Sequence, residues 1–332
     1  MTDDLWEPFL DLLKVHRRFL LTTHTRADGD GVGCELVLHR FLTKRGKEAV
    51  ILTHEPVPDK LAFLDRRRVI KTVDESALET GAYNDFDVLV SLDNSYRHRI
   101  GALAALCDRP GLVKVAIDHH VFRGTFADVA VVDETACSVG QMLFDFLKQQ
   151  RVKIDRAYAR PLYVALVTDT GYFSYPNTTP AAHAMAAELL QFKVDPTRIN
   201  ELIYQRNTLA QAKLLGLALH TLHTDLDGRL AWFSVTHADA ERIGVDPDDT
   251  EFFIDFVRQL EAVEVIAFFR HLKRGTVNIS LRAKSKVNVE TIAKQYGGGG
   301  HATMAGMQVN GAFKTVVADI VATLKREMTR KS

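Results

Sequence analysis

The feature that most constrains the fold is a short apolar run that ends in three ionisable side chains. Residues 112–120 read LVKVAIDHH, so a β-branched stretch is followed directly by Asp118, His119 and His120. Such a run is typical of a buried parallel strand, and open parallel sheets place their chemistry at the carboxyl ends of their strands. Three neighbouring ionisable groups continue a core poorly but can hold a divalent metal ion. We therefore expect a functional site at the end of this strand.

The same pattern recurs at three other places in the first half of the chain. Apolar runs end in ionisable groups in FLLTTHTRADGD (His24, Asp28, Asp30), DVLVSLD (Asp93) and YVALVTD (Asp169). Each pattern alone has an ordinary explanation, because an Asp-Gly-Asp-Gly stretch is often a turn or a calcium-like loop, and an Asp at a strand end is often a helix N-cap. Chance does not explain why four apolar runs of one predicted sheet all end in ionisable groups. We expect four strand ends that meet at one site.

Strand-like and helical stretches alternate through this half of the chain. Strands are expected at 17–24, 46–53, 85–93, 112–120 and 127–135, and helices at 5–18, 32–44, 62–65 and 137–150. Residues 156–168 mix helix and strand character before Asp169. This alternation predicts an α/β fold with a parallel sheet and helices on both faces.

The order of expected strands and helices changes after a helical segment at 180–219, which Pro196 interrupts. Beyond it, strands are expected at 228–236, 263–272 and 276–284, with helices at 238–243, 249–260 and 288–295. This pattern predicts a second, smaller α+β domain. We expect a catalytic metal-binding domain at 1–185, a helical connector at 186–219 and a substrate-binding domain at 220–332.

Composition restricts the class of partner and the compartment. The chain has 332 residues with 42 Lys and Arg and 42 Asp and Glu, so its formal net charge is zero. A neutral chain is not expected to bind long nucleic acid through its overall charge. Three scattered cysteines, Cys34, Cys107 and Cys137, indicate a reducing compartment without a disulfide framework. No signal peptide and no apolar run of about 18–20 residues is recognisable. We expect a cytoplasmic protein with no membrane partner.

Four carboxylates and two imidazoles are the candidate metal ligands: His24, Asp28, Asp30, Asp93, His119 and Asp169. Hard oxygen ligands suit Mg or Mn, and imidazole shifts the preference toward Mn. The set suffices for two adjacent ions with a bridging carboxylate, and a water shared by the ions would be the nucleophile. Gly29, Gly31 and Gly33 are expected to let the loop turn tightly around the ions.

A second candidate site lies near the other end of the chain. Gly297–Gly300 precede His301, and Arg282 lies on an expected strand upstream. Backbone N–H groups of a glycine loop can bind an anion, and a guanidinium matches phosphate geometry. A flexible linker and a solvated surface arginine are the alternatives. Residues 302–306, ATMAG, resemble the start of a small-residue helix. We favour a ligand-binding loop.

Together, HTRADGDG, VSLDNS, AIDHH, VTDTGYFSYPNTT, SLRAK and GGGGHATMAG resemble the DHH phosphoesterase superfamily with a C-terminal DHHA1 domain. The layout is similar to the nano-RNase group of oligoribonucleases and pAp phosphatases, which is related to RecJ-type exonucleases. The motifs follow the family order from residue 24 to residue 306. The resemblance implies a phosphoesterase with two divalent ions, Mn preferred and Mg an alternative, whose site lies in a cleft between the DHH and DHHA1 domains.

The resemblance also implies roles for single residues. One ion would be held by His24, Asp28 and Asp93, and the other by Asp30, Asp93, His119 and Asp169, with Asp93 as the bridge. Asp118 would orient an imidazole. His120 would contact the nucleophile or the scissile phosphate.

The substrate would be bound by residues of both domains. Arg282 and the loop Gly298, Gly299, Gly300 and His301 would bind its terminal phosphate or nucleotide. Arg99 lies where the family often has a basic residue near the site, although Arg97 and His98 compete for that role.

We therefore expect hydrolysis of short oligoribonucleotides (a 3′–5′ nanoRNA exonuclease) and of 3′-phosphoadenosine 5′-phosphate by a metal-activated hydroxide. Short RNA or small nucleotides would be the partners, and the sequence leaves a homodimer open. Hydrolysis of cyclic di-AMP or linear pApA is the nearest alternative. A type II pyrophosphatase or polyphosphatase would carry a Lys/Arg-rich signature that is not found here. A non-catalytic nucleotide sensor would have lost a metal ligand, and a processive RecJ-like exonuclease would need extra domains.

Overall fold

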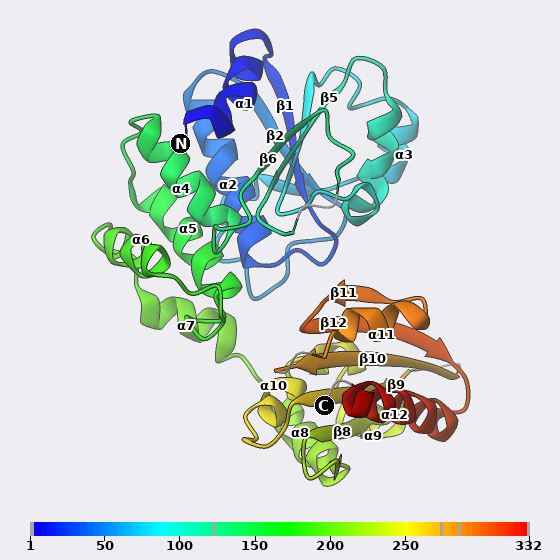
Figure 1. The fold of residues 1–332 in the computed structure, drawn as a ribbon. Coiled ribbons are helices and arrows are strands. Elements are labelled where there is room, and N and C mark those ends of the chain that lie inside the picture. Colours follow the sequence, from blue (N-terminus) through cyan, green and yellow to red (C-terminus); the bar gives the residue numbers. More distant parts are fainter. Residues whose placement is uncertain (1–2, 122–123, 273–274, 285–286, 331–332) are drawn as a thin grey trace. The chain divides into compact units, whose positions relative to one another are not determined.

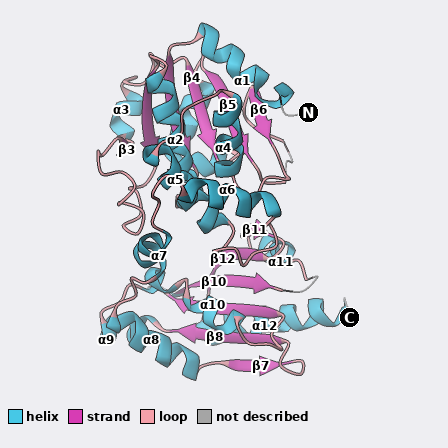
Figure 2. Cartoon of the chain, turned by 90° about the vertical axis from the view of Figure 1, so that its left-hand side faces the viewer, coloured by secondary structure: helices cyan, strands magenta, loops and turns pink. Residues whose placement is uncertain are grey.

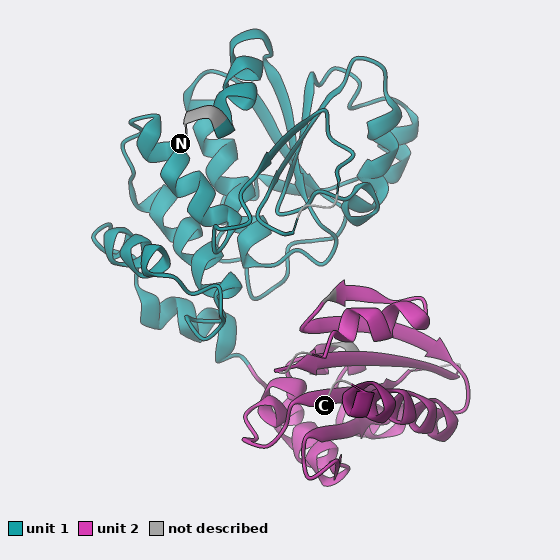
Figure 3. Ribbon diagram, in the orientation of Figure 1, with its two compact units in different colours: residues 1–206 teal, residues 207–332 magenta. Residues whose placement is uncertain are grey.

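The computed structural model describes residues 3–121, 124–272, 275–284 and 287–330. The chain divides into two compact units, residues 1–206 (unit 1) and residues 207–332 (unit 2), as Figure 3 shows. The boundary between the two units falls within residues 186–219, which were predicted to form the helical connector. Among the described residues, no helix is both long enough and apolar enough to cross a membrane.

Unit 1 is built on a parallel sheet of six strands in the order β3-β2-β1-β4-β5-β6 (Figures 1 and 2). The strands are β1 (Arg18–Thr23), β2 (Glu48–Thr53), β3 (Ile70–Thr72), β4 (Val88–Leu92), β5 (Val113–Asp118) and β6 (Val129–Val132). The chain builds outward from β1 on one side and from β4 on the other. In open α/β sheets, ligands bind at the carboxyl ends of the strands where the order reverses in this way.

Helices cover both faces of this sheet, which confirms the predicted fold class. They are α1 (Asp3–Val15), α2 (Gly29–Lys44), α3 (Glu75–Glu79), α4 (Val139–Gln149), α5 (Arg156–Asp169), α6 (Pro180–Leu190) and α7 (Pro196–Tyr204), with the 3-10 segment η1 (Arg97–Asp108). Alternate residues of β1 enter different cores: Phe19 and Leu21 pack with α1, α2, α4 and α5, whereas Leu20 packs with η1. Burial on both faces explains why the central strands read as continuous apolar runs.

Two predictions of local structure in unit 1 were wrong. Residues 156–169 form helix α5, so Asp169 ends a helix rather than a strand. Asp155 caps this helix by accepting hydrogen bonds from the backbone of Ala157 and Tyr158, and its middle is buried almost all round, which hides the helical period. Residues 62–64 form a turn and Asp65 lies in no regular element, so the short helix expected at 62–65 is absent there.

Unit 2 contains a mixed sheet of six strands in the order β11-β12-β10-β9-β8-β7, in which only β8 and β9 run parallel. The strands are β7 (His223–Asp225), β8 (Leu230–Val235), β9 (Val265–His271), β10 (Thr276–Ala283), β11 (Gly299–His301) and β12 (Met304–Asn310). The helices are α8 (Leu209–His220), α9 (His237–Ile243), α10 (Phe253–Arg258), α11 (Val289–Gln295) and α12 (Phe313–Arg330), with the 3-10 segment η2 (Pro247–Thr250).

The helix expected at 302–306 is wrong, because β12 begins at Met304. This strand pairs antiparallel with β10 along its whole length, and Ala305 and Met307 alternate into the core. The tertiary pairing therefore overrides the helical propensity of small residues.

Candidate metal centre

The candidate site of unit 1 lies at the carboxyl ends of three neighbouring strands. His24 follows β1, Asp93 follows β4, and Asp118 is the last residue of β5, directly before His119 and His120. The strands β1, β4 and β5 pair in register, so their ends meet at one edge of the sheet. Helix α5 brings Asp169 to the same place from outside the sheet.

Three overlapping groups of metal-ligating atoms result. They are His24, Asp28 and Asp93; Asp30, His119 and Asp169; and Asp93, His119 and His120, and within each group the ligand atoms lie within 4.8 Å of one another. The Nε2 atom of His24 lies 3.3 Å from Asp93 Oδ2. The Nε2 atom of His119 lies 3.6 Å from Asp93 Oδ1 and 3.3 Å from Asp169 Oδ2. All six predicted metal ligands are thus brought together, with Asp93 central.

Asp93 is held in an unusual backbone conformation. Its φ is 56°, in the left-handed region that Asp tolerates better than most residues. Its N–H donates to the carbonyl of Ile117, 2.9 Å away on β5, and the residue is only 2% exposed. A single carboxylate is therefore fixed where β4 and β5 end, facing His24 with one oxygen and His119 with the other.

The first turn of α2 supplies two further carboxylates. Asp28 is the N-cap, and its Oδ1 accepts from the N–H groups of Asp30 and Gly31. Its Oδ2 lies 3.9 Å from His24 Nε2. Asp30 is fully buried and accepts from the N–H groups of Val139 and Gly140 at the start of α4. Both carboxylates are oriented by helix N-termini, whose dipoles favour negative charge.

The predicted role of the three glycines was wrong, because Gly29, Gly31 and Gly33 lie inside α2 and not in a loop. A Cβ atom on Gly29 would lie 2.4 Å from Thr168 Oγ1, and one on Gly33 would lie 2.6 Å from the carbonyl of Pro161. Both contacts are with α5. Gly29 and Gly33 therefore allow α2 to approach α5 closely, which brings Asp28 and Asp30 to Asp169.

Hydrogen bonds orient the imidazoles. Nδ1 of His24 lies 2.8 Å from the carbonyl of Thr25, and Nδ1 of His119 lies 3.2 Å from the carbonyl of Ala136. A carbonyl can only accept, so we assign the Nδ1 proton to both rings, which leaves each Nε2 as a metal ligand. Nδ1 of His120 lies 2.8 Å from Asp118 Oδ1, so Asp118 orients this ring.

Buried atoms without partners test whether metal ions fit here. Asp93 Oδ1, His119 Nε2 and Asp169 Oδ2 are buried and lack a hydrogen-bond partner among the described residues. Burial and the charges of Asp93 and Asp28 raise the pKa of Asp169 well above its ordinary value, and burial with the charges of Asp93 and Asp169 does the same for Asp30. Buried unpaired polar atoms and crowded carboxylates are costly unless cations compensate them. The donor set therefore fits hard or borderline divalent ions.

His120 and Arg99 are basic side chains of this region. Burial lowers the pKa of His120, but the hydrogen bond to Asp118 and the charge of Asp93 outweigh burial and raise it to about 9 in the protein without metal. Arg99 is half-buried, and its charge acts on the pKa of His24. The competing Arg97 forms an ion pair with Asp108.

The predicted binding residues of unit 2 lie on adjacent strands. Arg282 of β10 pairs with Met304 of β12, which pairs with His301 of β11, so Arg282 and His301 share one cross-strand row. The Arg282 side chain is 11% exposed and lies 3.7 Å from Glu251. The side chain of His301 lies outside the described part of the chain.

The glycine run is partly explained by close strand packing. A Cβ atom on Gly298 would lie 2.3 Å from the carbonyl of Gly306, and one on Gly300, whose φ is 143°, would lie 2.4 Å from the carbonyl of Met304. Gly299 meets nothing within 4 Å. Of the three, only Gly299 is left without a packing reason to be glycine.

One contact of the site was missed in the sequence. The thiol of Cys34 donates to Asp30 Oδ1 at 3.2 Å, from one turn further along α2. Cys34 follows Asp30 by four residues, and side chains at this spacing on a helix are neighbours, so the contact could have been predicted. The bonds from Val139 and Gly140 could not be anticipated, because they depend on how α4 packs.

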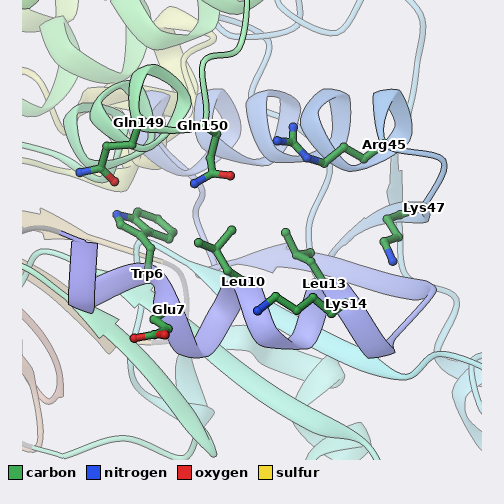
Figure 4. Close-up of a pocket in the computed structure, with 9 residues that line it drawn as sticks. All are labelled: Trp6, Glu7, Leu10, Leu13, Lys14, Arg45, Lys47, Gln149 and Gln150. Atoms are coloured by element: carbon green, nitrogen blue, oxygen red, sulfur yellow. The ribbon is translucent and has the colours of Figure 1, made fainter.

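A separate pocket of about 670 Å³ lies between α1 and the far ends of α2 and α4 (Figure 4). It is lined by Trp6, Glu7, Leu10, Leu13, Lys14, Arg45, Lys47, Gln149 and Gln150. Its three cations already have structural partners: Lys14 binds Asp11, Lys47 donates to the carbonyl of His16, and Arg45 stacks on the ring of Phe41. None of the candidate metal ligands lines this pocket.

Comparisons with known proteins identify the family of the chain. Residues 18–166 match the DHH family, N-terminal domain, and residues 233–330 match the DHHA1 domain. The chain is 30% identical over 315 residues to the bifunctional oligoribonuclease and PAP phosphatase NrnA of Thermus thermophilus, covering 93% of this chain and 90% of that protein.

Solved structures share the fold. An exopolyphosphatase-related protein from Bacteroides fragilis superposes with a TM-score of 0.89 at 22% identity, over 99% of this chain and 96% of that chain. A structure of exonuclease RecJ bound to manganese gives a TM-score of 0.54 at 16% identity, over 95% and 93% of the two chains. The chain belongs to the DHH/DHHA1 phosphoesterase family.

Proposed function

We propose that this protein is a metal-dependent phosphoesterase that hydrolyses short oligoribonucleotides and 3′-phosphoadenosine 5′-phosphate. The observation that carries the proposal is the set of ligand groups around Asp93. Buried atoms of Asp93, His119 and Asp169 have no hydrogen-bond partner in the part of the chain that the structure describes. The name of the Thermus thermophilus relative supports the substrate class. Imidazole in the ligand set and manganese in a RecJ structure of the same fold support manganese over magnesium.

The ligand groups divide into two proposed ion sites. One is formed by His24, Asp28 and Asp93, and the other by Asp30, Asp93, His119 and Asp169. Two bound divalent ions would neutralise charge on the phosphoryl group and lower the pKa of a water so that it attacks at neutral pH. The backbone of α4 and the carbonyls of Thr25 and Ala136 hold the ligands in place.

Cationic side chains bind the phosphate in this proposal. His120, oriented by Asp118, donates a hydrogen bond to a phosphate oxygen as the charge on that oxygen grows. Arg99 supplies a second cation, and it is preferred to Arg97 because Arg97 is engaged by Asp108.

Unit 2 contributes the recognition of the nucleotide in this proposal. Arg282, restrained by Glu251, binds a terminal phosphate, and the backbone of Gly299 approaches the substrate where a side chain would obstruct it. Gly298, Gly300 and His301 shape the same strand end. The helical segment 186–219 links this substrate-binding part to the catalytic part.

A substrate panel tests the proposal. Metal-stripped protein with added Mn would be incubated with pAp, pApA, an RNA trimer, an RNA 24-mer, cyclic di-AMP and pyrophosphate, and products would be separated by chromatography. Turnover of pAp and the trimer, with slow turnover of the 24-mer, is expected. Preference for cyclic di-AMP would assign the same residues to second-messenger turnover. No turnover of any substrate by Mn-loaded protein would contradict an enzymatic function.

A further inference from the structure

A cluster of arginines on unit 1 has no part in the metal centre. Arg66 lies in the loop between β2 and β3, Arg156 and Arg160 lie on α5, and Arg198 lies on α7. The guanidinium of Arg160 is half-buried and stacks 4.8 Å from the centroid of the Phe63 ring. It makes no hydrogen bond or ion pair with the described residues. A planar cation held in this way can still present its N–H edge to an anion.

The charges that act on Arg160 are those of other arginines. Burial lowers the pKa of Arg160, and the charges of Arg66, Arg156 and Arg198 lower it further, with no carboxylate among the charges that act on it. Arg156 also lies at the N-terminus of α5, where a helix disfavours positive charge. Arg198 has an ion pair with Glu201, but both side chains are exposed and such pairs contribute little. Repulsion between neighbouring like charges is unfavourable, and a bound anion relieves it.

A loop connects the cluster with the rim of the metal centre. It comprises residues 54–69, between β2 and β3. At its start, Glu55 accepts from the N–H of Arg26, two residues before Asp28. Its later part carries Phe63 and the run Arg66, Arg67 and Arg68. A negatively charged chain that leaves the metal centre could therefore follow this loop to the arginines.

Helix α5 shows how long an RNA must be to extend from the metal centre to Arg160. Asp169 and Arg160 are nine residues apart on this helix, which at a rise of 1.5 Å per residue is about 14 Å along its axis. Stacked nucleotides advance about 3.4 Å each, so about four nucleotides cover this distance. A mononucleotide or dinucleotide at the metal centre is too short to reach.

We propose that Arg66, Arg156, Arg160 and Arg198 bind the phosphodiester backbone of RNA longer than about four nucleotides, beyond the nucleotides held at the metal centre. The proposal rests on the proposed function and adds a second subsite to it. Guanidinium groups bind phosphates and carboxylates with the same bidentate geometry. RNA is favoured here because the metal centre is proposed to hold one end of an RNA chain, whose next phosphates would extend toward the arginines. An acidic peptide is therefore the alternative occupant that the test must separate.

Binding measurements test the subsite without turnover. Full-length wild type, Arg66→Gln and Arg160→Gln would be titrated with fluorescently labelled RNA of two and seven nucleotides in EDTA, at several salt concentrations. Loss of one phosphate contact reduces the slope of log K against log salt by about 0.7, which is about fivefold in affinity at 0.1 M salt. The heptamer should lose this affinity in both variants, and the dimer should not. Arg66 is exposed, so Arg66→Gln is expected to fold normally even if Arg160→Gln disturbs packing on Phe63.

Arg17→Gln is the matched control, because Arg17 is exposed at the amino end of β1, the sheet edge away from the metal centre. Equal heptamer affinity and salt slope in wild type and both cluster variants would overturn the subsite. Displacement of the heptamer by polyglutamate as readily as by unlabelled RNA would also overturn the assignment to RNA. In parallel, turnover of pAp by wild type reports on the proposed function alone, and the cluster variants should leave it unchanged.

Discussion

Replacing Asp93 by Asn tests the shared role of this carboxylate. Its two oxygens lie 3.3 Å from His24 Nε2 and 3.6 Å from His119 Nε2, so one side chain faces both proposed ion sites. Asn has nearly the same shape and also tolerates the left-handed backbone. The fold should therefore survive while both ion sites lose a charged ligand.

The magnitude follows from linkage between metal binding and stability. Mn at 100 times its dissociation constant stabilises the folded protein by about 2.7 kcal/mol. In a unit of about 200 residues, each kcal/mol of stabilisation raises the melting temperature by about 2–4 °C. Mn should therefore raise the melting temperature of the wild type by about 5–11 °C. Asp93→Asn should gain almost nothing. If the ions supply about 4 kcal/mol of transition-state stabilisation, kcat/KM should fall about a thousandfold.

Differential scanning fluorimetry with and without Mn, followed by turnover of pAp, provides the assay. Asp227→Asn is the control, because Asp227 is exposed in unit 2 and has the same φ of 56°. It should keep both the Mn-dependent gain and the activity. A gain for Asp93→Asn equal to that of wild type, or turnover within tenfold of it, would refute the reasoning.

Three further predictions concern packing and buried charge. Gly29→Ala places a Cβ atom 2.4 Å from Thr168 Oγ1 and should destabilise unit 1 by about 1–3 kcal/mol in urea unfolding; an unchanged midpoint would show that α2 and α5 are not in tight contact. Gly299→Ala should fold normally but raise KM for pAp several-fold, whereas Gly300→Ala should lower the melting temperature of unit 2; equal stability of the two variants would contradict the strand packing. Glu35 is fully buried with neither carboxylate oxygen hydrogen-bonded to the described residues, and burial raises its pKa well above 4.5. Because the folded state holds the proton that the unfolded state releases, this group lowers stability as the pH rises above about 4.5. Glu35→Met should therefore stabilise by about 1–3 kcal/mol more at pH 8 than at pH 5, and a gain independent of pH would contradict the burial of an ionisable group.

The sequence identified the sheet and its functional edge because β1, β4 and β5 are buried on both faces. Continuous apolar runs that stop at polar residues mark both the strand and its end, so His24, Asp93 and Asp118 could be placed from sequence alone. Asp169 could be named as a site residue but not placed on its element. Helix α5 is surrounded by other helices, and a helix that is apolar all round has no period to read.

Contacts between distant segments could not be predicted, because they depend on tertiary packing that the sequence pattern does not show. Gly29 and Gly33 read as turn residues, because nothing in the sequence shows that α5 lies against them. Residues 302–306 read as a helix, because the pairing of β12 with β10 involves a partner more than 20 residues away. The hydrogen bonds from α4 to Asp30 depend on the final packing of two helices.

The most direct test of the account is the location of manganese in crystals of the protein, measured by anomalous scattering at the Mn absorption edge. Two peaks about 3.5–4 Å apart are expected. One should contact His24 and Asp28, the other Asp30, His119 and Asp169, and both should contact Asp93. A single peak, or two peaks of which one does not contact Asp93, would contradict the dinuclear centre.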